Sequence, residues 1–186
     1  MVIMDYGINA IYHKDNFATQ DELNILNSYM NDLPQPEIKS INLISDIKND
    51  VVKETMIKLD ERIQEFVEKS YFPSFGYSVK MFGWFRELEL IKWSSFAQLP
   101  AHIDGDDVKE YPVITIGGLI YLNDEYHGGE IAFPEYEVMI KPQPGDLVLF
   151  PCHYLHEVKV IRPLEEGVTR RHTMPVFYTL VIQKND

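Results

Sequence analysis

The chain from Tyr71 onward is rich in aromatic and β-branched residues, and proline or glycine interrupts it at near-regular intervals. Short apolar runs separated by turn-forming residues predict many short antiparallel strands. We therefore expect a mainly β fold of the jelly-roll type, built as an antiparallel sandwich or barrel. The candidate strands cover residues 77–83, 86–93, 98–104, 113–121, 129–133, 137–140, 146–150, 155–162 and 169–182.

Two helices are expected before this β-rich region. Thr19 and Glu22 form a capping box, which satisfies orphan amides at the start of a helix running to about Asn31. A longer helix opens at Ser45 or Asp46, because apolar residues then recur at helical spacing. We expect both helices to cover one side of the sheet and to carry no chemistry.

The length of 186 residues suits a single domain that buries its core without metal or disulfide staples. We expect one domain over residues 1–186, with residues 1–70 as a helical support region and residues 71–186 as the β core. The single cysteine, Cys152, has no partner for an intramolecular disulfide, and we expect it to be buried as a small apolar residue.

The charge balance narrows the range of partners. The chain has 17 Lys and Arg against 29 Asp and Glu, and the net charge of -12 opposes binding to nucleic acid. The first residues lack a basic and apolar leader, and no segment approaches the roughly 18 apolar residues of a membrane span. We expect a cytoplasmic protein that binds neither nucleic acid nor membrane, and the oligomeric state stays open.

An HxD sequence, formed by His102 and Asp104, is followed by His156 after a further stretch of strands. Residues i and i+2 of an extended segment point the same way, so His102 and Asp104 share a face. Two imidazoles and one carboxylate are the ligand set of a mononuclear non-haem iron centre, which leaves coordination positions open for chemistry. These three residues are therefore the candidate metal ligands.

The motifs around these residues resemble those of the 2-oxoglutarate and Fe(II)-dependent dioxygenases, specifically the prolyl 4-hydroxylase-like branch. The resemblance covers residues 87–182, roughly half of the chain. It implies a cupin-like double-stranded β-helix, which agrees with the jelly roll expected from the strand pattern. It rests on an ordered set of motifs: HxD at 102–104, YLN at 121–123, GGExxFP at 128–134, PxxGD at 142–146 and HEV at 156–158.

The resemblance also implies roles for individual residues. His102, Asp104 and His156 would bind iron, and 2-oxoglutarate and O2 would take the remaining positions. Arg171 would complete the catalytic set by forming a planar bidentate pair with the distal carboxylate of 2-oxoglutarate. Tyr121 would contact the same cosubstrate. Ascorbate is an optional further cofactor in this reading.

The arginine assignment departs from the usual family spacing. Arg171 follows His156 by fifteen residues, a longer interval than usual, and residues 162–167 look like a lengthened hairpin that absorbs the difference. Arg170 is therefore the competing choice, although it should point to the opposite face of the strand. A surface ion pair with Glu165 or Glu166 is the alternative role for Arg171.

Other residues near the motifs receive different interpretations. Trp93 stands where many family members have a tyrosine that helps to bind the cosubstrate. Pro175 implies an edge or a bulge in the last strand, because proline cannot donate to a ladder. We expect His127, His153 and His172 to be loop or outward-facing residues rather than ligands. Some of residues 71–86 are candidates for contact with substrate.

The expected function is that of an Fe(II)- and 2-oxoglutarate-dependent dioxygenase that hydroxylates a prolyl residue in a peptide or protein, consuming O2 and releasing succinate and CO2. The alternatives are a hydroxylase of free amino acids or other small molecules and a non-catalytic metal-binding jelly-roll module. A nucleic-acid demethylase fits less well, because that branch has a second arginine at the position of Phe177.

Overall fold

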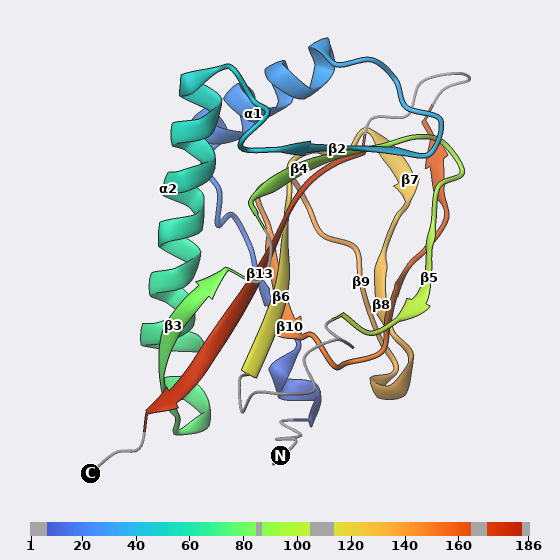
Figure 1. Ribbon diagram of the computed structural model, residues 1–186. Coiled ribbons are helices and arrows are strands. Elements are labelled where there is room, and N and C mark those ends of the chain that lie inside the picture. The colour runs from blue at the N-terminus through green and yellow to red at the C-terminus, as the bar shows by residue number, and fades with distance from the viewer. Residues whose placement is uncertain (1–6, 85–86, 105–113, 165–170, 184–186) are drawn as a thin grey trace.

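The protein is described by a computed structural model that covers residues 7–84, 87–104, 114–164 and 171–183 (Figure 1). Two antiparallel sheets enclose the interior, and two helices cover the outer side of the larger sheet. This arrangement confirms the predicted mainly β fold of the double-stranded β-helix type with flanking N-terminal helices. None of the helices in the described ranges combines the length and the apolar character needed to cross a membrane.

The larger sheet consists of β1 (Tyr12–Lys14), β10 (Leu147–Pro151), β6 (Ile114–Tyr121), β13 (Arg171–Gln183), β4 (Glu89–Trp93) and β2 (Lys39–Leu43) in that order, and β3 (Ser78–Trp84) also pairs with β13. The smaller sheet consists of β5 (Leu99–His102), β11 (His156–Val158), β8 (Ile131–Phe133) and β9 (Val138–Ile140). A separate pair joins β12 (Ile161–Pro163) to β7 (Tyr126–Gly128), so the predicted strand over residues 155–162 is divided in two.

The first helix, α1 (Gln20–Asp32), begins as predicted at a capping box formed by Thr19 and Glu22. The second helix, α2 (Asp50–Phe66), begins later than the predicted Ser45 or Asp46. The reason is a local cap, since the Asn49 side chain accepts hydrogen bonds from the amides of the first turn of α2. The shorter helical turns are η1 (Gly7–Ala10), η2 (Val67–Tyr71), η3 (Pro73–Phe75) and η4 (Pro134–Tyr136).

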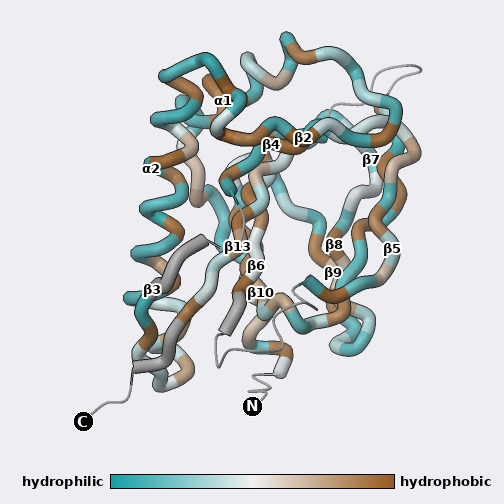
Figure 2. The backbone as a smooth tube through the Cα atoms, in the orientation of Figure 1, coloured by the Kyte–Doolittle hydropathy of each residue, from teal (hydrophilic) through white to brown (hydrophobic). Residues whose placement is uncertain are grey.

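The main apolar core lies between the two helices and the outer side of the larger sheet. Along both helices apolar and hydrophilic residues alternate (Figure 2), as expected for helices that place one face on a sheet. The sheet contributes every second residue of β13 to this core. The core residues include Leu26 and Met30 of α1, Met56, Leu59 and Ile63 of α2, and Met174, Val176 and Tyr178 of β13.

The other residues of β13 face the space between the two sheets. Arg171 is paired with Trp93 of β4, and Thr173 is paired with Tyr121 of β6. Residues that are paired across antiparallel strands lie on the same face of a sheet. The inner face therefore gathers Arg171, Thr173, Trp93 and Tyr121 at one end of the barrel.

Pro175 occupies a gap in the pairing of the long strand β13. On one side of β13 the strand β6 pairs without interruption, with Pro175 opposite Leu119. On the other side, β4 pairs with residues 171–173 and β3 with residues 178–183. Within the described part of the chain, Pro175 thus lies at a local edge of an interior strand, where its missing N–H costs no ladder hydrogen bond.

Candidate active site

His102, Asp104 and His156 converge at the cavity between the two sheets. His102 lies directly opposite His156, because β5 and β11 pair with these two residues in register. His102 Nε2 is 3.5 Å from Asp104 Oδ1, and His156 Nε2 is 3.4 Å from Asp104 Oδ2. One donor atom from each residue lies within 4.8 Å of the other two, which is the separation expected for groups that share one cation.

The backbone orients both histidine rings. His102 Nδ1 lies 2.8 Å from the carbonyl oxygen of Pro100, and His156 Nδ1 lies 2.9 Å from that of Tyr154. A carbonyl oxygen only accepts, so each Nδ1 carries the proton and donates it. Both Nε2 lone pairs are then directed toward Asp104, as is typical of metal-binding imidazoles held by a second hydrogen bond.

The two histidines differ in their surroundings. The hydrogen bond with Asp104 raises the pKa of His102, whose side chain remains 31% exposed. Burial lowers the pKa of His156, whose side chain is 5% exposed. His156 is therefore the candidate ligand that favours the neutral form, because a charged imidazole would be desolvated there.

The backbone around Asp104 leaves space for its carboxylate. The Asp104 amide donates to the carbonyl oxygen of Cys152 over 2.7 Å, which anchors the residue just beyond the end of β5. Gly117 lies beside this carboxylate and has no side chain to crowd it. A Cβ atom added to Gly117 would lie 3.2 Å from Cys152 Sγ and 3.6 Å from Asp104 Oδ2. Cys152 itself is buried, as predicted.

Arg171 is completely buried on the inner face of the larger sheet. Its guanidinium carbon lies 5.2 Å from the ring centre of Trp93, 5.4 Å from that of Tyr121 and 5.8 Å from that of Tyr126. We call these three rings the aromatic cage. Among the described residues, none of the three guanidinium nitrogens has a hydrogen-bond partner.

The aromatic cage fits a bound carboxylate. A buried guanidinium without an anion is costly, because cation–π contacts recover only part of its lost hydration. The phenol oxygen of Tyr121 also has no hydrogen-bond partner among the described residues. Burial raises the pKa of Tyr121 above its ordinary value, and the charge of Arg171 partly opposes this rise. The phenol therefore stays protonated and can donate to an anion that sits beside Arg171.

Two residues beside the Arg171 guanidinium were not predicted from the sequence as part of the site. Tyr126 forms one wall of the aromatic cage and is 4% exposed. Gly129 has a left-handed φ of +68°, and a Cβ atom there would lie 2.8 Å from the Tyr126 ring and 3.2 Å from Arg171 Nε. The second glycine of the GGE motif thus has a physical role, since only glycine lets the chain pass this close to both side chains.

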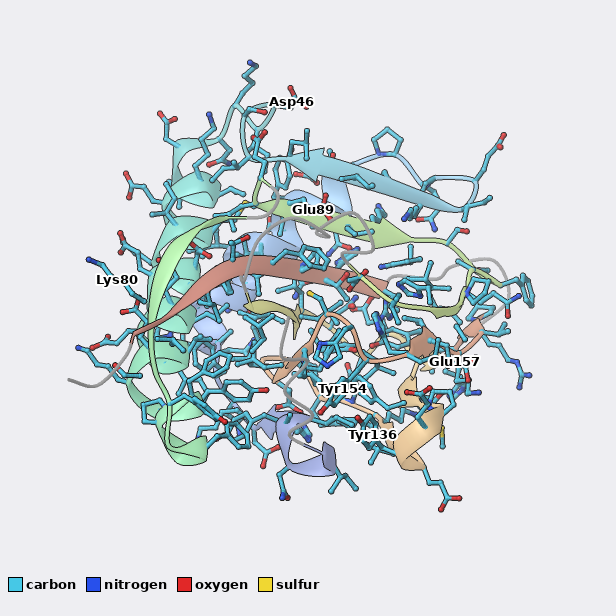
Figure 3. All side chains as sticks on the ribbon, turned by 60° about the horizontal axis from the view of Figure 1, so that its bottom comes forward. Asp46, Lys80, Glu89, Tyr136, Tyr154 and Glu157 are labelled. Carbon is cyan, nitrogen blue, oxygen red and sulfur yellow. The ribbon has the colours of Figure 1, made fainter. Side chains whose placement is uncertain are left out.

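A cavity of about 230 Å³ lies beside the three candidate ligands. Lys39 and Glu89 contribute charge to its wall, from β2 and β4 respectively. Figure 3 shows Glu89 on the larger sheet, and Tyr136 and Tyr154 close together on the opposite side of the barrel, where their rings stack at 4.6 Å. The larger sheet also lines the cavity with apolar side chains, among them Ile41, Ile91, Trp93, Leu119, Pro175 and Phe177.

The other histidines do not join this site. His127, in β7, and His153, in a turn, are both exposed, as expected of loop or outward-facing residues. His172 departs from that expectation, because it is fully buried on the helix side of the larger sheet. The reason is its place in β13, where it alternates with the inward-facing Arg171.

Several further predictions fall outside the described residues or belong to the core. Arg170, Glu165 and Glu166 lie outside the described residues, so neither the competing arginine nor the ion-pair alternative is placed. Tyr71 and Phe72, from the segment proposed to contact substrate, are buried in the main core.

A second group of residues with potential metal-binding atoms lies outside the cavity, and hydrogen bonds within the protein already occupy its buried carboxylate. His13, Asp15 and Asp146 lie within 4.8 Å of one another. Asp146 Oδ2 is 2.8 Å from His13 Nε2, and both of its carboxylate oxygens accept backbone amides, from Asn16 and Gln143. This network explains the aspartate of the PxxGD motif, which fastens β1 to the turn before β10.

Comparison with known proteins relates this part of the chain to a known family. The sequence profile of the 2OG-Fe(II) oxygenase superfamily matches residues 91–179, a segment that contains all three candidate ligands and Arg171. No curated protein matches the chain by sequence.

Solved structures share the fold at low sequence identity. The viral collagen prolyl hydroxylase from Paramecium Bursaria Chlorella virus-1 has a TM-score of 0.66 at 14% identity, covering 94% of this chain and 97% of that protein. A Pseudomonas putida prolyl-4-hydroxylase has a TM-score of 0.63 at 17% identity, covering 94% and 95%. The non-heme alpha ketoglutarate dependent epimerase SnoN from nogalamycin biosynthesis has a TM-score of 0.62 at 12% identity, covering 91% and 77%. Residues 91–179 thus match the 2OG-Fe(II) oxygenase superfamily, and this match, on a shared fold, indicates a 2-oxoglutarate/Fe(II)-dependent dioxygenase.

Proposed function

We propose that His102, Asp104 and His156 bind the Fe(II) of this enzyme, and that Arg171 and Tyr121 bind the distal carboxylate of its 2-oxoglutarate. The single observation that carries the proposal is the Arg171 guanidinium, which is fully buried and without a hydrogen-bond partner among the described residues. A guanidinium forms two parallel hydrogen bonds with a carboxylate, so the cosubstrate supplies the partner that this charge lacks.

The residues of the site have separate tasks in this proposal. The Nδ1 hydrogen bonds of His102 and His156 keep both Nε2 atoms available for the metal. The aromatic cage excludes water from Arg171, which strengthens its attraction for a carboxylate. When bound, iron and 2-oxoglutarate supply the oxidising chemistry that inserts one oxygen atom of O2 into a substrate C–H bond, with succinate and CO2 as the other products.

We further propose that the substrate is a prolyl residue in a peptide or protein. Two proteins of similar fold are prolyl hydroxylases. The cavity beside the candidate ligands is small and mostly apolar, which suits an aliphatic ring better than a charged or extended polar group. A cytoplasmic setting belongs to the same proposal, supported by the single cysteine of the sequence, which cannot form an intramolecular disulfide.

A free amino acid is the second candidate substrate. The observation that favours it is Lys39 in the cavity wall, because its ammonium group suits the carboxylate that a free amino acid carries. Mass spectrometry separates the two substrate classes. Proline-containing peptides and free amino acids are incubated with enzyme, Fe(II), 2-oxoglutarate and O2, and the class that gains one oxygen atom is the substrate class.

The site itself is tested without a known substrate. Purified metal-free protein is titrated with Fe(II) and 2-oxoglutarate under anaerobic conditions, and the visible charge-transfer band of the chelated cosubstrate is followed. We expect a band in the wild type, no band in His102→Ala, and a far higher 2-oxoglutarate requirement in Arg171→Met. His127→Ala is the matched histidine control, because His127 is exposed and belongs neither to the three candidate ligands nor to the residues that line the cavity. A folded wild type that gives no band would contradict the proposal.

A further inference from the structure

A buried polar group lies on the helix side of the larger sheet, directly behind Arg171. His172 follows Arg171 along β13, points to the opposite face and is fully buried. Its backbone amide donates to Asn123 Oδ1 over 2.9 Å, and its Nδ1 lies 2.9 Å from Asn27 Oδ1 of α1. Two side chains from different parts of the chain therefore contact the residue next to the buried arginine.

The Asn27 amide has a defined orientation. Its Nδ2 donates to the carbonyl oxygen of Leu122 over 2.6 Å, so its Oδ1 is left to accept from His172 Nδ1. Leu122 also donates its amide to the carbonyl oxygen of His172 over 3.0 Å. Asn27 thus joins the end of β6 to the start of β13, just beyond the last strand pair of Tyr121 and Thr173.

A second contact from α1 reaches the neighbouring strand. Lys92 is paired with His172 across β4 and β13, and it is 4% exposed. Its ammonium group donates to the carbonyl oxygens of Met30 over 3.0 Å and Leu33 over 2.7 Å, at the C-terminal end of α1. A cation at this position satisfies helix-end carbonyls and complements the helix dipole. The helix is therefore bonded to both strands that carry Arg171 and Trp93.

We propose that Asn27 is a positioning residue for 2-oxoglutarate, which acts through His172 and Leu122 on the backbones that carry Arg171 and Tyr121. This inference rests on the proposed function of those two residues. The Arg171 guanidinium makes no hydrogen bond of its own within the described residues, so its position depends on its backbone and on the aromatic cage. A displacement of about 1 Å at such a site is enough to weaken a geometric fit severely.

The test separates cosubstrate binding from metal binding. Asn27→Ala is titrated with Fe(II) and then with 2-oxoglutarate, using the charge-transfer band and calorimetry as readouts besides turnover. We expect roughly tenfold weaker 2-oxoglutarate binding, the ratio that corresponds to the loss of about one hydrogen bond, with Fe(II) binding unchanged. The KM for 2-oxoglutarate should rise by the same factor while kcat at saturating cosubstrate is retained.

Two further variants keep the test decisive. Asn27→Asp retains an acceptor for His172 but loses the donor to Leu122, and it should weaken 2-oxoglutarate binding to a smaller degree, roughly threefold. Leu26→Ala is the control for general destabilisation, because Leu26 is a fully buried core residue of the same helix. It should lower the unfolding midpoint without changing the 2-oxoglutarate titration.

The possible outcomes are distinct. A normal wild-type titration together with unaltered Asn27 variants would overturn this inference alone. Equal weakening in Leu26→Ala would also overturn it, because the effect would then follow stability rather than the Asn27 contacts. Absence of the band in a folded wild type would instead overturn the proposed function on which the inference rests.

Discussion

The indole Nε1–H of Trp93 donates to Thr173 Oγ1 over 3.2 Å, and both side chains are buried on the inner face of the larger sheet. Indole has a single donor, so Trp93 has none left for a ligand while this bond is formed. Its ring instead covers the guanidinium of Arg171. Trp93 therefore contributes an apolar wall to the aromatic cage. The Thr173 hydroxyl only accepts in this bond, so its own proton can still be donated to another group.

A double-mutant cycle tests the bond between Trp93 and Thr173. Trp93→Phe keeps an aromatic wall but loses the donor, and Thr173→Val loses the acceptor. The hydrogen bond itself should contribute about 1 kcal/mol to the free energy of unfolding. Because both substitutions remove this one bond, the double variant should be less destabilised than the sum of the two by about that amount. Strictly additive losses in urea unfolding would contradict the prediction.

Arg171→Met tests whether the buried charge is maintained for ligand binding at the expense of stability. Replacing a buried charge by an apolar side chain of similar length is often neutral or stabilising, by about 1–4 kcal/mol. We expect the cosubstrate-free variant to have an unfolding free energy no lower than that of the wild type. The further stabilisation that 2-oxoglutarate gives to the Fe(II)-loaded wild type should be largely lost in the variant, because a ligand that binds only the folded state raises stability in proportion to its affinity.

Arg62→Met is the matched control for this prediction. Arg62 donates to Glu22 over 2.8 Å and to the carbonyl oxygen of Phe17 over 3.0 Å, so it holds α2 to the start of α1. Its loss should lower the thermal unfolding midpoint and leave the ligand-induced shift intact. A larger loss of stability in Arg171→Met than in Arg62→Met would show that the buried guanidinium stabilises the fold.

Local sequence signals predicted the elements that depend on local interactions. The capping box of Thr19 and Glu22 is such a signal, since its four groups lie within one turn. The strand β2 (Lys39–Leu43) was missed because its short sequence carries little pattern, and it is defined by pairing with β4. Sequence patterns therefore predicted the helices and strands that have strong local signals. The short strand β2 is instead defined by the strand with which it pairs.

The residues of the site also divide into those that were predicted from the sequence and those that required the structure. The family resemblance selected Arg171, which lies on the inner face, and the HxD spacing predicted a shared face for His102 and Asp104. Tyr126 and Asn27 reach Arg171 and its neighbour only through the tertiary fold. No spacing rule links a residue of α1 to a strand 145 positions later, so these contacts required the structure.

Gly129→Ala should damage the cosubstrate pocket specifically. The backbone at Gly129 has a φ of +68°, and the new methyl group would lie 2.8 Å from the Tyr126 ring and 3.2 Å from Arg171 Nε. We expect a loss of roughly 1–3 kcal/mol in unfolding free energy from backbone strain, and weaker 2-oxoglutarate binding from displacement of Arg171.

Gly76→Ala supplies the control for this substitution. Gly76 also has a left-handed φ, of +79°, but apart from its two chain neighbours no described residue lies within 4 Å of its added Cβ. It should show the backbone strain alone, with an unchanged 2-oxoglutarate titration. If both variants bound 2-oxoglutarate like the wild type, the contact between Gly129 and the aromatic cage would have no functional consequence.

The pH dependence of stability should depend on Tyr178, which lies beneath α2. The Tyr178 phenol donates to Asp60 Oδ1 over 2.6 Å. Burial, and then the neighbouring Asp60 carboxylate, raise the pKa of Tyr178 well above its ordinary value of 10.0. In the unfolded chain the phenol loses its proton near pH 10, while in the folded protein it keeps that proton to higher pH.

The sign of the effect follows from proton linkage. Above pH 10 the unfolded state binds fewer protons than the folded state, so the stability contributed by Tyr178 is complete below pH 10 and is lost as pH rises toward its folded pKa. One such group changes the unfolding free energy by about 1.4 kcal/mol per pH unit.

Tyr178→Phe should be less stable at neutral pH, because the Asp60 contact is gone, but its stability should fall less steeply between pH 10 and 11. Urea unfolding at a series of pH values measures both slopes, and parallel curves would mean that the phenol of Tyr178 ionises as readily in the folded protein as in the unfolded chain.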